Sequence, residues 1–179
     1  MNQQPVSRNC FVCGVENPIG LGMRFYETNT DPVQVIAEYT VPARYQGYPG
    51  VVHGGIVATM LDEVTSRTIF RGNPPRFVVT ARLSIRYRKP VPVETPLRLT
   101  GRIVEDKGRV ITVAGEIQGP GGILLAEAEA VVVEVEPSFF GEDIFSSSDW
   151  QVYPDAHPVT DSVESRAASG ADERSGGGS

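Results

Sequence analysis

The chain has 179 residues and a formal net charge of −6, which favours one folded domain with an extension. Residues 1–136 carry 14 basic and 14 acidic side chains, and such a balanced region argues against a nucleic-acid partner, because nucleic-acid-binding domains are normally basic. No apolar run of eighteen or more residues occurs, and the first residues lack an apolar signal core. We therefore expect a soluble, cytoplasmic protein without a membrane partner.

Residues 1–22 form an N-terminal segment, expected to pack on the domain, in which the motif Cys10-Phe11-Val12-Cys13-Gly14 stands out. A zinc site with four ligands needs partners that the chain barely supplies, since only His53 and His157 remain among the soft ligands. A redox pair should open a helix, whereas the residues that follow the motif are typical of turns. We therefore expect two buried cysteines, no metal and no cofactor. A four-cysteine metal site shared by a dimer is the alternative.

The period of the apolar residues changes twice between the N-terminal segment and residue 75. Alternation predicts two strands at residues 23–26 and 33–41. A tight turn at Pro49-Gly50 follows, and from Ile56 apolar residues recur at intervals of three and four. This pattern predicts a long buried helix that runs to about Phe70, before glycine and proline stop it at residues 72–75.

Four further strands are predicted after the helix, at residues 77–89, 97–106, 109–118 and 123–136. The alternation in the first of them predicts a single buried face. Glycine-rich turns between the later strands predict consecutive hairpins and therefore an antiparallel sheet. Only the helix is able to cover the apolar face of this sheet, so we expect an α+β fold in which about five or six strands wrap around the helix.

The composition shifts beyond Pro137 to serine, glycine and acidic residues, and residues 137–179 are predicted to be a polar, disordered tail. The alternative is that aromatic side chains, Trp150 and Tyr153 among them, anchor a short stretch of this tail to the domain.

The start of the helix carries the sequence Val52-His53-Gly54-Gly55. Unpaired amides in the first turn beside two glycines are suited to an anion or a developing oxyanion. Asp62 follows Gly54 by eight residues, which places it about 12 Å away along the helix axis, too far for both to reach the same substrate atom. If both act on one carbonyl, a second copy of the helix must supply the carboxylate, which predicts a two-fold dimer. Glu63 lies about 100° from Asp62, so only one of these acids points into such a site, and the spacing favours Asp62.

These features, together with residues 9–21 in the pattern Asn-Cys-Phe-x-Cys-Gly-x-x-Asn-Pro-x-Gly-Leu, resemble the hotdog-fold acyl-CoA thioesterases of the PaaI-like group. The resemblance covers residues 9–136, with the hotdog domain at residues 23–136. It implies hydrolysis of an acyl-coenzyme A substrate by a homodimer or a dimer of dimers. The substrate carbonyl would lie at the start of one helix, and a carboxylate would come from the opposite subunit.

The resemblance also implies roles for individual residues. The amide of Gly54 or Gly55 would polarise the thioester oxygen, and Asp62 would act as the nucleophile or as the base that activates water. Thr80, at the start of the strand after the helix, would orient the water or the carboxylate. His53 would either position the turn and contact the thioester, or cap the helix through backbone hydrogen bonds.

The substrate-binding candidates are a second set of polar side chains. Coenzyme A needs cations for its phosphates, and residues 82–109 hold eight basic side chains against three acidic ones. Solvated side chains on an exposed strand face are the alternative interpretation of these cations. The complete set of candidates is Arg86, Arg88 and Lys89 at a strand end, Gln46 as a second carbonyl donor, and Glu63.

Two other functions remain open. A hydratase or dehydratase of the same fold would need a histidine and an acid placed to move protons along the acyl chain, and no such pair is present on the helix. A non-catalytic acyl-CoA-binding module would keep the fold and lose the acid, whereas Asp62 is present.

Overall fold

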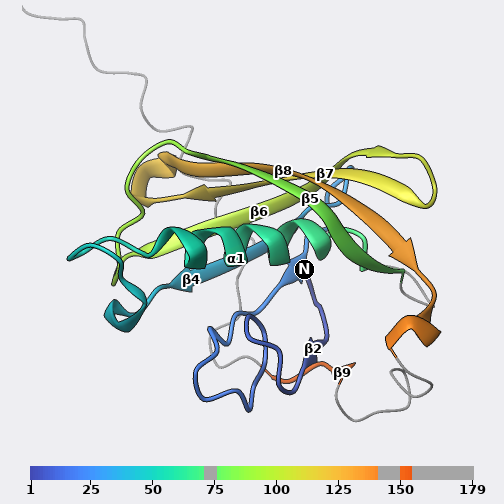
Figure 1. Ribbon diagram of the computed structural model, residues 1–179, viewed down its shortest axis with the longest axis horizontal. Helices are drawn as coiled ribbons and strands as arrows, with labels where there is room; N and C mark the ends of the chain where they lie inside the picture. Colours follow the sequence, from blue (N-terminus) through green and yellow to red (C-terminus); the bar gives the residue numbers. More distant parts are fainter. Residues whose placement is uncertain (71–75, 141–149, 155–179) are drawn as a thin grey trace, which may run out of the picture.

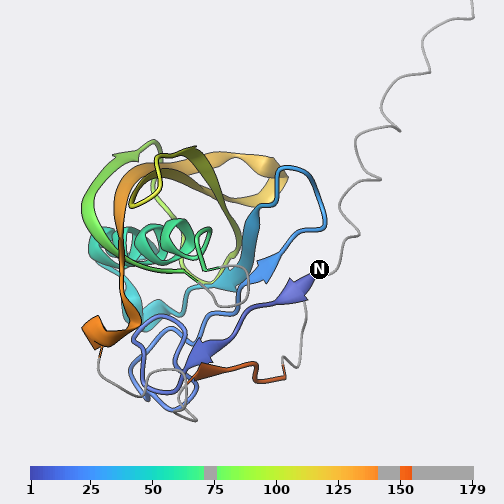
Figure 2. The same cartoon turned by 90° about the vertical axis from the view of Figure 1, so that its right-hand side faces the viewer.

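The computed structural model describes residues 1–70, 76–140 and 150–154. Within these ranges one α-helix, α1 (Gly54–Ser66), lies along one face of a large antiparallel sheet (Figure 1). Seen along the helix axis, the sheet curves around the helix (Figure 2). The predicted architecture of a long helix wrapped by a sheet is confirmed. No helix in the described ranges has the length and apolar character needed to cross a membrane.

Among the described residues the sheet has seven strands rather than the predicted five or six, because the first residues of the chain add one at the edge. From one edge to the other, the strands are β1 (Asn2–Gln3), β3 (Tyr26–Glu27), β4 (Val35–Thr40), β6 (Pro96–Asp106), β7 (Val110–Gln118), β8 (Leu124–Val135) and β5 (Phe77–Tyr87). The four strands after the helix lie within two residues of their predicted bounds. Short 3-10 helices occur at η1 (Ala43–Tyr45), η2 (Pro120–Gly122) and η3 (Pro137–Phe140).

The first strand after the helix does not pair with the next strand in the chain. β6, β7 and β8 form consecutive hairpins as expected, but β5 pairs with β8, and β6 pairs with β4. The chain after β5 turns away from the sheet, and its Val91 carbonyl accepts a hydrogen bond from the Val52 amide beside the helix start. Prolines at 90 and 92 prevent a tight hairpin here, because each lacks a backbone donor. β5 is therefore an edge strand.

The helix packs directly against the backbone of the sheet. Its buried side chains belong to the main hydrophobic core, and they are Val57, Met60, Leu61 and Val64. A Cβ atom added at Gly101 of β6 would lie 2.3 Å from the carbonyl oxygen of Val64, and one at Gly115 of β7 would lie 2.7 Å from Thr65 Cγ2. Only glycine fits at these contacts, so these two positions set the distance between helix and sheet.

The predicted single buried face of the strand after the helix is incomplete. Phe77 is buried, Leu83 and Ile85 are half-buried, and Tyr87 is 54% exposed. A β-bulge between Thr80 and Arg82 interrupts the alternation. Because β5 lies at the edge, the described part of the chain covers it on one side only.

The N-terminal segment and part of the tail pack together on the domain. β2 (Val6–Ser7) pairs with β9 (Trp150–Gln151), and the Trp150 ring stacks on Phe70 with centroids 5.2 Å apart. The Tyr153 carbonyl accepts a hydrogen bond from the Gln3 side chain. The prediction of a disordered tail is thus wrong for residues 137–140 and 150–154, where Phe140 contacts the Phe77 ring and Trp150 stacks on Phe70. The rest of the tail, like the predicted helix stop at residues 72–75, lies outside the described residues.

Candidate active site

Asp62 lies on the face of α1 that is directed toward β5. Thr80 Oγ1 donates a hydrogen bond of 2.8 Å to Asp62 Oδ1, and Ser66 Oγ lies 3.3 Å from Thr80 Oγ1. Burial is the largest influence on Asp62 and raises its pKa, while the hydrogen bond from Thr80 opposes that rise. The result is a half-buried carboxylate of increased basicity, held in one orientation by a hydroxyl group. Such a group is suited to accept a proton from water or to act as a nucleophile.

The start of the helix is capped by its own preceding residue. His53 Nδ1 accepts a hydrogen bond of 3.0 Å from the Gly55 amide, and the His53 carbonyl accepts the amides of Ile56 and Val57. Within the described ranges the Gly54 amide has no hydrogen-bond partner. Of the two predicted amides, the Gly54 amide is therefore the one left to bind an anion at the positive end of the helix dipole.

Tyr87, which no sequence motif marks as a site residue, lies beside this amide. Its hydroxyl donates to the Gly54 carbonyl at 3.0 Å. A Cβ atom added at Gly54 would meet the Tyr87 ring at 3.8 Å, an ordinary contact, so crowding within the chain does not require glycine at this position. Thr80 and Tyr87 are seven positions apart, so strict alternation would direct them to opposite faces of the strand. Both contact the same helix because the bulge after Thr80 shifts the alternation. No sequence pattern marks that bulge.

Within one chain the two halves of the predicted site lie apart. Asp62 contacts Thr80 near one end of β5, whereas Gly54 contacts Tyr87 at the other end. This agrees with the helix geometry, which separates these two residues by about 12 Å along the axis.

The other predicted residues lie in three places. Gln46 Oε1 accepts the Gly50 amide at 3.1 Å and so holds the turn before the helix. Glu63 points toward the N-terminal segment and forms an ion pair of 2.8 Å with Arg67. The structure therefore brings Thr80, but not Glu63, to Asp62.

The three predicted cations lie at the end of β5 near Tyr87. Arg86 is exposed, and Arg88 forms an ion pair with Glu127 of β8. The amides of Arg88 and Lys89 both donate to the Leu125 carbonyl, which fixes the backbone at this end of the strand. The charges are thus near the helix start rather than near Asp62 of the same chain.

A long helix wrapped by an antiparallel sheet confirms the predicted hotdog fold. The sequence profile of the Thioesterase superfamily matches residues 49–126 of the chain. Its fold is similar to the crystal structure of a thioesterase superfamily protein, with 36% identity, a TM-score of 0.65, and coverage of 72% of this chain and 64% of that one.

Two further relatives are informative. The acyl-coenzyme A thioesterase THEM4 of Rattus norvegicus is 30% identical over 122 residues, which cover 66% of this chain and 51% of that protein. The chain thus spans about half the length of that curated relative. A putative thioesterase from Ralstonia eutropha, described as related to phenylacetic acid degradation, is 25% identical with a TM-score of 0.56, and the match covers 64% of this chain and 86% of that one.

Proposed function

We propose that the protein hydrolyses an acyl-coenzyme A thioester to a free acid and coenzyme A. The observation that carries the proposal is the half-buried Asp62 carboxylate oriented by Thr80, on the same helix as the unpartnered Gly54 amide. The names of the THEM4 relatives, which are acyl-coenzyme A thioesterases, support this substrate class.

In the proposed enzyme each active site is shared by two subunits. β5 is an edge strand that carries half-buried Leu83 and Ile85, and pairing with a second β5 would cover them. If two β5 strands pair antiparallel with the two-fold axis between Leu83 and Ser84, Thr80 of one lies opposite Tyr87 of the other. Because Thr80 holds Asp62 and Tyr87 holds Gly54, this register brings the acid of one subunit to the amide of its partner.

The proposed mechanism follows from this arrangement. The Asp62 carboxylate accepts a proton from a water molecule as the water oxygen bonds to the thioester carbon. The carbonyl electron pair moves onto its oxygen, where the Gly54 amide and the helix dipole stabilise the charge. Collapse of this intermediate breaks the carbon–sulfur bond, and the proton goes to the departing thiolate of coenzyme A. Thr80 keeps the carboxylate in position during both steps.

An apolar pocket offers space for the acyl group. It has a volume of about 340 Å³ and opens beside Ser66, one helical turn beyond Asp62. Its apolar lining consists of Phe70, Phe77, Val78, Phe140 and Trp150. A volume and lining of this kind are typical of sites for small apolar ligand groups.

The test is turnover of a panel of acyl-coenzyme A thioesters, with the released thiol measured by a chromogenic reagent. We expect hydrolysis by the wild type and a fall in kcat of about 10²-fold or more in Asp62→Asn, since general-base help is commonly of that size. Glu38→Gln, which removes an exposed acid of β4, is the matched control and should keep full activity. Tight binding of the panel without turnover would instead favour the non-catalytic module. Addition of water to an enoyl-coenzyme A would favour the hydratase.

A further inference from the structure

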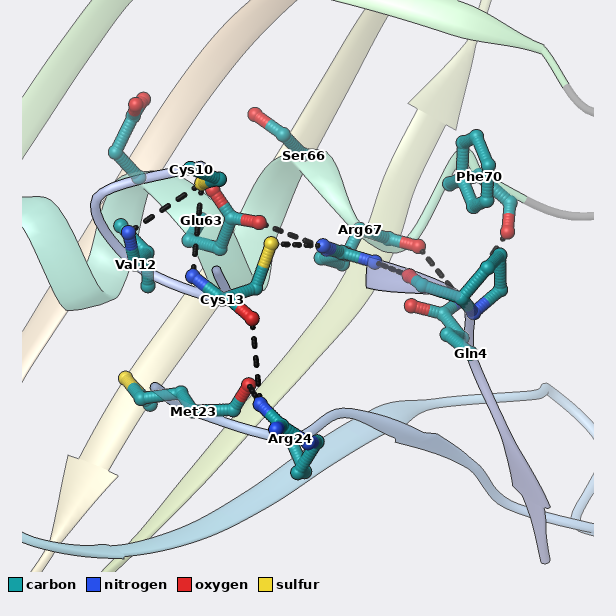
Figure 3. A network of polar contacts seen from close by, with 12 residues as sticks. Gln4, Cys10, Val12, Cys13, Met23, Arg24, Glu63, Ser66, Arg67 and Phe70 are labelled. Atoms are coloured by element: carbon teal, nitrogen blue, oxygen red, sulfur yellow. Dashed lines mark hydrogen bonds and ion pairs between the residues drawn. The ribbon is translucent and has the colours of Figure 1, made fainter. Parts of the chain in front are cut away.

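A second cluster of reactive side chains lies on the other side of the helix from Asp62. Cys10 and Cys13 of the N-terminal segment face Glu63 of α1 (Figure 3). The two sulfur atoms and one carboxylate oxygen of Glu63 all lie within 4.8 Å of one another. The proposed hydrolysis uses none of these three groups.

The turn around Cys10 is shaped to hold a negatively charged sulfur. The amides of Val12 and Cys13 both point at Cys10 Sγ, at 3.3 and 3.5 Å. A neutral thiol is a weak acceptor, whereas a thiolate or a metal-bound sulfur accepts several donors. The turn closes with a hydrogen bond of 2.9 Å from the Gly14 amide to the Cys10 carbonyl. A Cβ atom at Gly14 would lie 2.3 Å from that carbonyl oxygen, so this turn requires glycine.

Arg67 donates hydrogen bonds to the other two members of the cluster, Cys13 and Glu63. Its side chain is almost fully buried, and it donates from Nη2 to Cys13 Sγ at 2.9 Å and from Nε to Glu63 Oε1 at 2.8 Å (Figure 3). Groups that ligate a metal are commonly oriented by donors of this kind. Two thiolates and one carboxylate carry three negative charges, which a divalent cation together with Arg67 would neutralise. This charge balance stabilises the metal-bound cluster, because an uncompensated charge inside a protein costs free energy.

We propose that Cys10, Cys13 and Glu63 bind one divalent cation of the zinc type, with water as the fourth ligand. Thiolate and carboxylate groups are both zinc ligands, and thiolates disfavour magnesium and calcium. The half-buried side chains of Cys10 and Glu63 leave an approach for water. The ion ties the N-terminal segment to the helix that carries Asp62.

This assignment differs from the expectation that the chain holds no metal. The sequence offers only His53 and His157 as further soft ligands, and Glu63 is predicted there as a substrate-binding residue. Glu63 lies beside the two cysteines only in the folded chain, because α1 packs next to the cysteine motif there.

The experiment is a metal titration of the full chain after reduction and treatment with a chelator. Co²⁺ is the probe, because thiolate coordination produces a sulfur-to-cobalt charge-transfer absorption. We expect this band to saturate at one Co²⁺ per chain and to disappear when Zn²⁺ displaces the cobalt. Zn²⁺ should also raise the melting temperature of the wild type, since a ligand that binds the folded state stabilises it.

Variants then identify the ligands. Cys10→Ser and Cys13→Ser should abolish the band, and Glu63→Gln should weaken Co²⁺ binding about tenfold or more. Glu16→Gln is the matched control, because this acid belongs to the same segment but forms an exposed pair with Arg8, and it should bind like the wild type.

The proposal is overturned if the wild-type chain gives no saturable band, a result that does not depend on whether any variant folds. Equal binding by the wild type and Cys10→Ser would overturn it as well. Unchanged affinity in Glu63→Gln would remove the third ligand and with it the proposed site. These readouts do not involve thioester hydrolysis, so they are independent of the proposed function.

Discussion

If the active site is shared by two subunits as proposed, two inactive variants should restore activity when they are mixed. Asp62→Asn removes the base, and Gly54→Val places two methyl groups beside the amide that would hold the carbonyl. A Cβ atom at position 54 makes only an ordinary contact of 3.8 Å with Tyr87, so the valine variant should fold. Each variant alone should lose about 10²-fold or more in kcat, the usual effect of removing a base or an oxyanion donor.

The size of the recovery follows from the two-fold geometry. In a mixed dimer, one site receives both the altered acid and the altered helix start, while the other site receives neither. Random exchange of equal amounts makes half of all dimers mixed, and each of these has one intact site out of two. We therefore expect recovery to about a quarter of wild-type activity per chain.

The assay is release of thiol from the best acyl-coenzyme A substrate after incubation under conditions that allow subunits to exchange. Heterodimers are confirmed with two distinguishable affinity tags, and the melting temperature of each variant shows that it is folded. For the matched control, Asp62→Asn is prepared once with each tag and the two preparations are mixed. This mixture should show no recovery of activity. If heterodimers form and activity stays at the level of the single variants, the shared site is refuted.

Three further predictions concern the acid, the tail and the helix contact. Thr80→Val removes a hydrogen bond that lowers the pKa of Asp62, so the acidic limb of kcat/KM should move to higher pH; an unchanged pH profile would contradict this role. Trp150→Ala removes a ring stack and a cation–π contact, together worth about 2 kcal/mol, and should lower Tm by roughly 4–8 °C in a thermal melt. Gly101→Ala places a methyl group against the Val64 carbonyl, and denaturant unfolding should show a loss of about 1–3 kcal/mol. If Gly101→Ala unfolds at the same denaturant concentration as the wild type, the helix can move away from the sheet at little cost and the close contact is not required.

The sequence by itself determined the helix and four of the strands, because each is specified by side chains close together in the chain. The apolar period of three to four residues marks α1, and alternation between glycine-rich turns marks β6, β7 and β8. The spacing of Gly54 and Asp62 is also readable from the sequence, because both residues lie on this one helix. Helix geometry alone therefore predicted that these two residues act together only across two subunits.

Only the tertiary structure decided which of these elements meet. β5 pairs with β8 rather than with its neighbour in the chain, and the bulge after Thr80 brings both Thr80 and Tyr87 to the helix. Glu63, adjacent to Asp62, lies beside Cys10 and Cys13, which precede it in the chain by 53 and 50 positions. Such contacts depend on how whole surfaces pack together, and each residue contributes only a small part of the packing energy. A local sequence pattern therefore does not predict them. The same reason explains Trp150, whose polar surroundings predicted disorder and whose ring packs on Phe70.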